Sequence, residues 1–176
     1  YASAVVMATQ IAAAAGGLGA LITSWFWFGK PSLSQTLNGC IAGLVSITAG
    51  CGNMTFFGAA VAGLVGGILV VASIEFVEKK LKIDDAIGAF SAHGTAGVWG
   101  TLVIGLWGVG DPMDAATGIG LFNGGGGEQF VTQLIGAASY CAWAAIMSAI
   151  VLAVLKATIG LRVSEEVEAE GLDINE

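Results

Sequence analysis

Charged residues are scarce in this chain of 176 residues: they make up 11% of it, whereas apolar residues make up 56%. A typical soluble domain is about a quarter charged, because its surface has to meet water. Apolar runs of about twenty residues, the length that crosses the hydrocarbon core of a bilayer, recur between the few polar stretches. The composition therefore predicts a membrane protein built of helices rather than a soluble domain.

Several kinds of site are missing as well. The three cysteines show neither a CxxC pair nor metal-ligand spacing, so we interpret them as small packing residues. The four consecutive glycines from Gly124 lack the Lys-Ser/Thr of a phosphate-binding loop. With a net charge of −7 and a single histidine, the chain offers no nucleic-acid patch, no HExxH motif and no pair of haem ligands. We expect no enzyme activity, no cofactor and no metal site.

Five apolar segments follow one another along the chain. The third and fourth have full spanning length, whereas the second is short enough to be re-entrant. Their predicted ranges are Val5–Phe28, Gln35–Cys51, Thr55–Val77, Ala86–Gly108 and Phe130–Ile159. The chain opens inside an apolar run without an initiator Met or a signal peptide, so we expect it to be a fragment of a longer protein.

The positions of lysine and arginine indicate how these segments cross. All six cations lie after the first segment, after the third, or at the close of the fifth: Lys30, Lys79, Lys80, Lys82, Lys156 and Arg162. If every segment crosses, all six fall on one side, as the positive-inside rule requires. We therefore predict five spans, with the start of the chain outside and the C-terminal tail in the cytoplasm.

Glycine is abundant, at 28 residues. In a membrane, small residues four apart allow helix backbones to approach closely. Gly39–Gly43 and Gly63–Gly67 have this spacing. They predict a closely packed bundle and say little about function.

His93 is the one histidine of the chain. It lies eight residues past Asp85, which places it about 12 Å into the fourth segment. Ionisable groups at that depth are costly and often mark a pathway, a proton relay or a ligand site. The alternative is a neutral imidazole that bonds to a neighbouring helix. Its neighbours on the helix face are apolar or small, which suits a small polar solute that sheds water better than an ion channel.

Three stretches resemble signatures of the Amt/Rh ammonium transporter family. They are Gly29-Lys-Pro-Ser with Asn38-Gly-Cys-Ile-Ala-Gly-Leu-Val-Ser-Ile-Thr-Ala-Gly-Cys51, then Asp84-Asp85-x-x-Gly-x-x-x-x-His93-Gly-x-x-Gly-x-Trp-Gly100, and Gly160-Leu-Arg-Val-Ser-Glu-Glu with Glu170-Gly-Leu-Asp173. They occur in family order and span essentially the whole chain. The resemblance implies an all-α, polytopic transmembrane helix bundle, with about five spans, the seventh to the eleventh, of an eleven-span inverted-repeat transporter.

The resemblance also implies the function and the residues that perform it. The family moves ammonium or ammonia through a narrow apolar pore lined by a histidine pair, of which this chain would supply one member. The implied residues of the substrate pathway are His93, Ala89, Ile41, Asn38 and Thr48, with Asp85 as a helix cap at the cytoplasmic mouth. The partner histidine, the outer recruitment site and the phenylalanine gate belong to spans that this chain lacks, so we do not expect it to conduct alone.

The predicted division is a transmembrane part over residues 1–162 and an acidic cytoplasmic tail over residues 163–176. The tail is either simply solvated or, as the resemblance implies, packed under a neighbouring subunit. The implied partners are ammonium or its analogue methylammonium, the lipid bilayer, further copies in a homotrimer and a PII-type regulatory protein at the cytoplasmic face, with no nucleic acid. The expected location is the cell membrane, with several passes.

Three other functions stay open from the sequence. The same fold can serve as an ammonium sensor that reports to a cytoplasmic partner, or as an Rh-type gas channel. The chain can also be a helix bundle in which His93 is purely structural. In a pore, we expect a change at His93 to disturb flux much more than a change at Thr95, whose hydroxyl has no evident role in the sequence.

Overall fold

A computed structural model describes residues 1–110 and 118–171 of the chain, and these residues form helices joined by short connections. The elements are α1 (Ala2–Phe28), α2 (Leu33–Thr48), α3 (Phe56–Phe76), η1 (Val77–Leu81), η2 (Ser91–Thr95), α4 (Ala96–Trp107), η3 (Leu121–Asn123), α5 (Glu128–Thr158) and α6 (Glu165–Glu170). Within these residues no strand occurs beyond an isolated bridge between Met54 and Gly108. The predicted all-α class is confirmed, and each predicted apolar segment contains helix. The fourth segment, Ala86–Gly108, is less helical than predicted: it begins with a turn and becomes helical only from Ala89.

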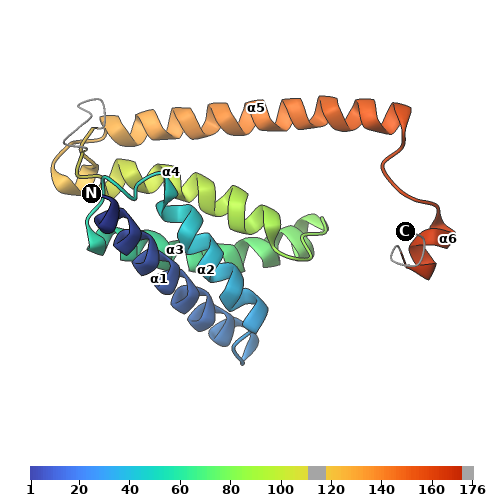
Figure 1. Ribbon diagram of the computed structural model, residues 1–176, viewed down its shortest axis with the longest axis horizontal. Coiled ribbons are helices and arrows are strands. Elements are labelled where there is room, and N and C mark those ends of the chain that lie inside the picture. Colours follow the sequence, from blue (N-terminus) through green and yellow to red (C-terminus); the bar gives the residue numbers. More distant parts are fainter. Residues whose placement is uncertain (111–117, 172–176) are drawn as a thin grey trace. The chain divides into compact units, whose positions relative to one another are not determined.

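The chain divides into two compact units, Tyr1–Ala137 and Ala138–Glu176. In the first unit, α1 packs against α2 and α3, and α2 also packs against α3 and α4 (Figure 1). The second unit holds the remainder of α5 and the short helix α6, which begins after Ser164. Arg162 lies 3.7 Å from Glu168 within this unit. The tail residues 172–176 lie outside the described residues.

Three helical stretches are long and apolar enough to cross a membrane: Ala2–Phe28, Phe56–Leu81 and Glu128–Thr158. Helix α2 has 16 residues, which gives it a length of about 24 Å. It nevertheless connects the two ends of the first unit. Its first turns line a pocket with Ala86 and Ile87, and the turn after its last residue leads to Met54, which bridges to Gly108 at the end of α4. Helix α2 therefore runs from one end of the first unit to the other.

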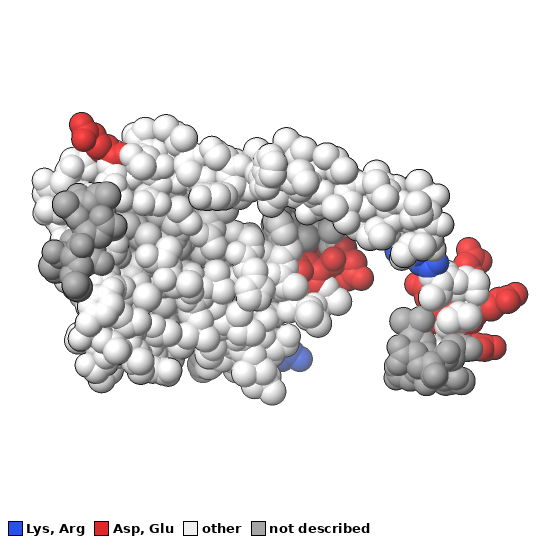
Figure 2. All heavy atoms as spheres, turned by 45° about the horizontal axis from the view of Figure 1, so that its top comes forward, with Lys and Arg blue, Asp and Glu red and all other residues white. Residues whose placement is uncertain are grey.

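The ends of α1 and α3 lie together and carry most of the cations of the first unit. Lys79 Nζ lies 2.5 Å from Glu75 Oε2 and 5.7 Å from the ring centroid of Phe28, the last residue of α1. Lys30 lies two residues after Phe28, so it belongs to the same end of the unit. On the face shown in Figure 2, the surface between the ends of this unit is uncharged. Cations gathered at one end of the unit are what the predicted topology requires, and the topology itself stays a prediction.

Close helix packing, which the glycine spacing predicts, is confirmed. A Cβ atom added to Gly43 or to Gly63 would overlap with the carbonyl oxygen of Ala12, and one added to Gly67 would overlap with the carbonyl oxygen of Gly16. These contacts bring the backbones of α1, α2 and α3 together without intervening side chains. Within this closely packed group, α2 and α3 are the helices that α4 contacts.

Candidate functional site

The residues assigned to the pathway come from two helical segments that run in the same direction. The contacts between these segments fix their register. A Cβ atom on Gly88 would lie 2.7 Å from Asn38 Nδ2, and one on Gly97 would lie 3.8 Å from Val45 Cγ1. His93 stands one turn before Gly97, and Ile41 stands one turn before Val45. The structure therefore brings His93 and Ile41 to the same level, with Ala89 and Asn38 one turn nearer the lysine-rich end.

The wall that these residues form is apolar and uncovered within the described part of the chain. Ile41 and Ala89 are exposed, as is His93. No hydrogen bond of the His93 ring to another described residue is present. Neither α2 nor the segment from Ala86 to Gly110 contains an aspartate, glutamate, lysine or arginine. A single imidazole on such a wall can donate or accept a hydrogen bond without offering a counter-charge.

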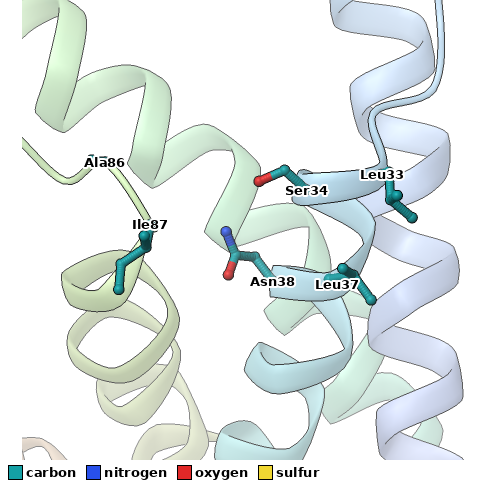
Figure 3. Close-up of a pocket in the computed structure, with 6 residues that line it drawn as sticks. All are labelled: Leu33, Ser34, Leu37, Asn38, Ala86 and Ile87. Atoms are coloured by element: carbon teal, nitrogen blue, oxygen red, sulfur yellow. The ribbon is translucent and has the colours of Figure 1, made fainter. Parts of the chain in front are cut away.

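Asn38 lies at the lysine-rich end of this wall. It lines a pocket of about 340 Å³ together with Leu33, Ser34, Leu37, Ala86 and Ile87. Figure 3 shows that Ser34 and Asn38 project their polar groups toward the segment that carries Ala86 and Ile87. The pocket therefore offers a hydroxyl and an amide to a polar solute before the apolar stretch begins.

Asp85 is buried, and its carboxylate accepts three hydrogen bonds. Oδ1 accepts from the Phe90 N–H at 2.9 Å, and Oδ2 accepts from the Ser91 N–H at 3.1 Å and the Ser91 hydroxyl at 2.8 Å. Free N–H groups at the start of a helix favour a carboxylate, which also meets the positive end of the helix dipole. The turn between them uses Gly88 at a φ of 68°. Asp85 thus sets where the histidine-bearing segment begins.

Thr48 lies on the same stripe of α2 as Ile41, but two turns farther from the lysine-rich end. It is exposed, and its hydroxyl donates to the Leu44 carbonyl of its own helix at 2.7 Å. The structure therefore brings Asn38, Ile41, Ala89 and His93 together, and leaves Thr48 toward the opposite end of the unit. The sequence resemblance groups all five without giving this order.

Sequence reasoning missed the shape of the turn that carries His93. Residues Ser91–Thr95 form a π-helix, in which the Ala96 N–H donates to the Ser91 carbonyl, five residues back. Thr95, to which the sequence assigns no role, pairs its hydroxyl with that of Ser73 on α3 at 2.7 Å. No local pattern in the sequence announces a π turn, although such turns often occur at functional sites.

Comparison with protein families and with curated proteins gives relatives of one kind. The model of the Ammonium Transporter Family matches residues 1–176. The chain is 37% identical over 172 residues to the ammonium transporter Amt1 of Haloferax mediterranei, covering 98% of this chain and 31% of that protein. It is 38% identical over 171 residues to the ammonium transporter Amt2 of Archaeoglobus fulgidus, covering 96% of this chain and 36% of that protein. These relatives are named as transporters, not as enzymes.

Solved structures agree with the sequence relatives. A protein titled "Sensor Amt Protein" superposes with a TM-score of 0.88 at 32% identity, covering 99% of this chain and 42% of that one. Mep2 of Saccharomyces cerevisiae gives a TM-score of 0.82 at 30% identity, covering 94% of this chain and 38% of that one. The chain spans about a third of the length of the first two curated relatives. With its apolar helices and a family match over its whole length, the chain is part of an integral membrane protein and belongs to the ammonium transporter family.

Proposed function

We propose that the complete protein carries ammonium or ammonia across the cell membrane, and that Asn38, Ile41, Ala89 and His93 form part of the wall of its path. The observation that best supports this proposal is the exposed His93 on an uncharged wall made by two parallel helical segments. The names of the relatives supply the substrate class.

The chemistry of the wall favours a neutral solute in its apolar stretch. An ammonium ion that leaves water loses strong hydrogen bonds, and an apolar wall without carboxylates does not replace them. Ammonia, which carries no charge, loses much less. His93 can hydrogen-bond the solute there, while Asn38 and Ser34 meet it in the pocket at one end. In the proposed pore His93 has a partner histidine supplied by spans outside this chain.

The arrangement in the membrane is proposed on the same grounds. The lysine-rich end, with Lys30 and Lys79, faces the cytoplasm, and so does the acidic tail from residue 163 onward. The complete protein assembles as a homotrimer, and a PII-type regulatory protein is a candidate partner at the cytoplasmic face. The clustering of cations at one end of the first unit supports the orientation.

The test is uptake of labelled methylammonium by cells that produce the complete protein, with wild type beside His93→Ala and both normalised to protein in the membrane. We expect saturable uptake that excess ammonium competes away. Because His93 is exposed in this chain and its removal leaves the packing intact, the variant should alter uptake at an unchanged amount of protein. Wild-type protein that is correctly inserted and shows no uptake would exclude transport.

An ammonium sensor is the second candidate function. The structure titled "Sensor Amt Protein" covers 99% of this chain at a TM-score of 0.88, so the fold of this chain is compatible with either role. A sensor would bind ammonium at the same wall but would show no saturable uptake. Binding of ammonium to inserted protein that does not transport would therefore favour the sensor.

A further inference from the structure

The turn that carries His93 is wider than a regular helical turn. In an α-helix each N–H donates to the carbonyl four residues back, whereas here the Ala96 N–H donates to the Ser91 carbonyl, five residues back, and to the His93 carbonyl, three residues back. One extra residue in a turn changes the direction of the following side chains by about 100° relative to a regular helix. The direction in which the His93 ring points therefore depends on whether this π turn is kept.

Irregular turns of this kind persist when surrounding contacts hold them. On the side that precedes the turn, the Asp85 carboxylate fixes the N–H groups of Phe90 and Ser91. On the side that follows, the Thr95 hydroxyl lies 2.7 Å from the Ser73 hydroxyl on α3. The turn is thus held at both of its ends by polar contacts.

A second contact shows that Thr95 belongs to the face that packs on α3. Trp99, four residues later, donates from Nε1 to the Ala62 carbonyl of α3 at 2.9 Å. His93 is two residues before Thr95 in this turn and is exposed, whereas the Thr95 hydroxyl faces Ser73 on α3. The imidazole and the hydroxyl pair therefore lie on roughly opposite sides of the same segment, so the hydroxyl pair can hold the segment without touching the solute.

We infer that Ser73 and Thr95 are positioning residues: their hydroxyl pair keeps the π turn between Ser91 and Ala96 and thereby aims His93 at the pathway. This inference rests on the proposed transport function. It also changes the expectation for Thr95, whose hydroxyl joins two helices. Without the pair, the segment can relax toward a regular helix and rotate the ring away from its place on the wall.

The test uses the complete protein with Thr95→Val, which keeps the side-chain shape and removes the hydroxyl, with Ser73→Ala, and with both changes together. Thr95→Ser is a conservative control, because it keeps the hydroxyl and removes only the methyl group. Thr101→Val is the matched control for the loss of a hydroxyl, because the Thr101 hydroxyl donates to the Gly97 carbonyl on its own helix at 3.0 Å. The first measurement is the apparent KM for methylammonium uptake, which does not depend on the amount of folded protein. We expect Thr95→Val and Ser73→Ala each to change it by about three- to tenfold, the scale of one lost hydrogen bond.

The two hydroxyls act as one unit, so the double variant should resemble either single variant rather than their product. Thr95→Ser and Thr101→Val should keep the wild-type KM. A merely structural role predicts a different result, in which maximal uptake falls with the amount of protein and KM stays unchanged in every variant. That result would overturn the inference.

Amide hydrogen exchange over residues 89–97 of the bilayer-embedded complete protein gives a measurement that needs no transport. We expect exchange to be faster by roughly fivefold in Thr95→Val and Ser73→Ala, and unchanged in Thr101→Val. If wild-type protein takes up no methylammonium, the transport proposal fails while exchange still tests whether the pair holds the turn. Exchange at the wild-type rate in both variants, or faster exchange with an unchanged KM, would contradict the assignment of these residues as positioning residues.

Discussion

The two sides of α2 differ sharply although they belong to one helix of 16 residues. On one side Gly39 and Gly43 leave no room for a Cβ atom, because the backbone of α1 lies against them. On the other side Ile41 and Thr48 are exposed and carry full side chains. The first side packs inside the bundle, and the second is the side that we propose to meet the solute.

This difference separates residues that hold the bundle together from residues that we propose to line the passage. Close backbone contact tolerates no added atom, because protein interiors are packed as densely as organic crystals. An exposed side chain can be changed with little effect on folding, so changes there should act on transport alone. The predictions below begin with a substitution on the packed side of α2 and end with one on its exposed side.

Gly43→Ala should have the largest effect on stability. Its Cβ atom would overlap with the Ala12 carbonyl oxygen, and overpacking of this kind costs about 1–3 kcal/mol. Gly97→Ala is the matched control, because its Cβ atom would meet only Val45 at an ordinary contact distance of 3.8 Å. Thermal unfolding of the complete protein should show a lower midpoint for the first variant and no loss for the second. Equal midpoints for Gly43→Ala and Gly97→Ala would mean that the packed side of α2 can accommodate an added methyl group, contrary to what its contacts indicate.

Asp85→Asn should have an intermediate effect. An amide has one acceptor oxygen, so it cannot accept from both the Phe90 N–H, which Oδ1 serves, and the two Ser91 donors, which Oδ2 serves, and loss of a helix cap costs about 0.5–2 kcal/mol. Asp84→Asn is the control, because Asp84 is exposed and accepts no hydrogen bond among the described residues. The midpoint of thermal unfolding should fall for Asp85→Asn and stay unchanged for Asp84→Asn. A fall of the same size in both would point to a general effect of charge instead of a cap.

Much of the fold could be predicted from the sequence. The apolar segments, the close packing of glycines and the gathering of lysines at one end follow from composition and spacing, which act over one helix at a time. The start of the fourth segment is also visible, because Asp85 precedes it and free N–H groups favour a carboxylate. The proposed pathway residues were predicted from the resemblance to the transporter family. The structure adds the register between the two segments that carry these residues.

What could not be predicted depends on contacts between segments far apart in the sequence. The Ser73–Thr95 pair joins residues 22 positions apart, and the π turn that it supports has no sequence signature. The end of α3 gives a second example. The spacing of Glu78 and Lys82 suits an ion pair on a continuing helix, but Lys82 adopts a left-handed backbone with φ 56° and ends the helix. Glu75 and Lys79, which have the same spacing, do form an ion pair, whereas Glu78 and Lys82 form none among the described residues.

The most direct test of the account is methylammonium uptake by the complete protein with Ile41→Trp, compared with Ile150→Trp. Ile41 is 40% exposed on the proposed wall at the level of His93, and Ile150 is 52% exposed on α5. A tryptophan at residue 41 should fill the path and reduce uptake nearly to background, with the amount of protein and its unfolding midpoint unchanged. Ile150→Trp should transport as wild type does. Wild-type uptake by Ile41→Trp would contradict the claim that α2 and the His93 segment line the route of the solute.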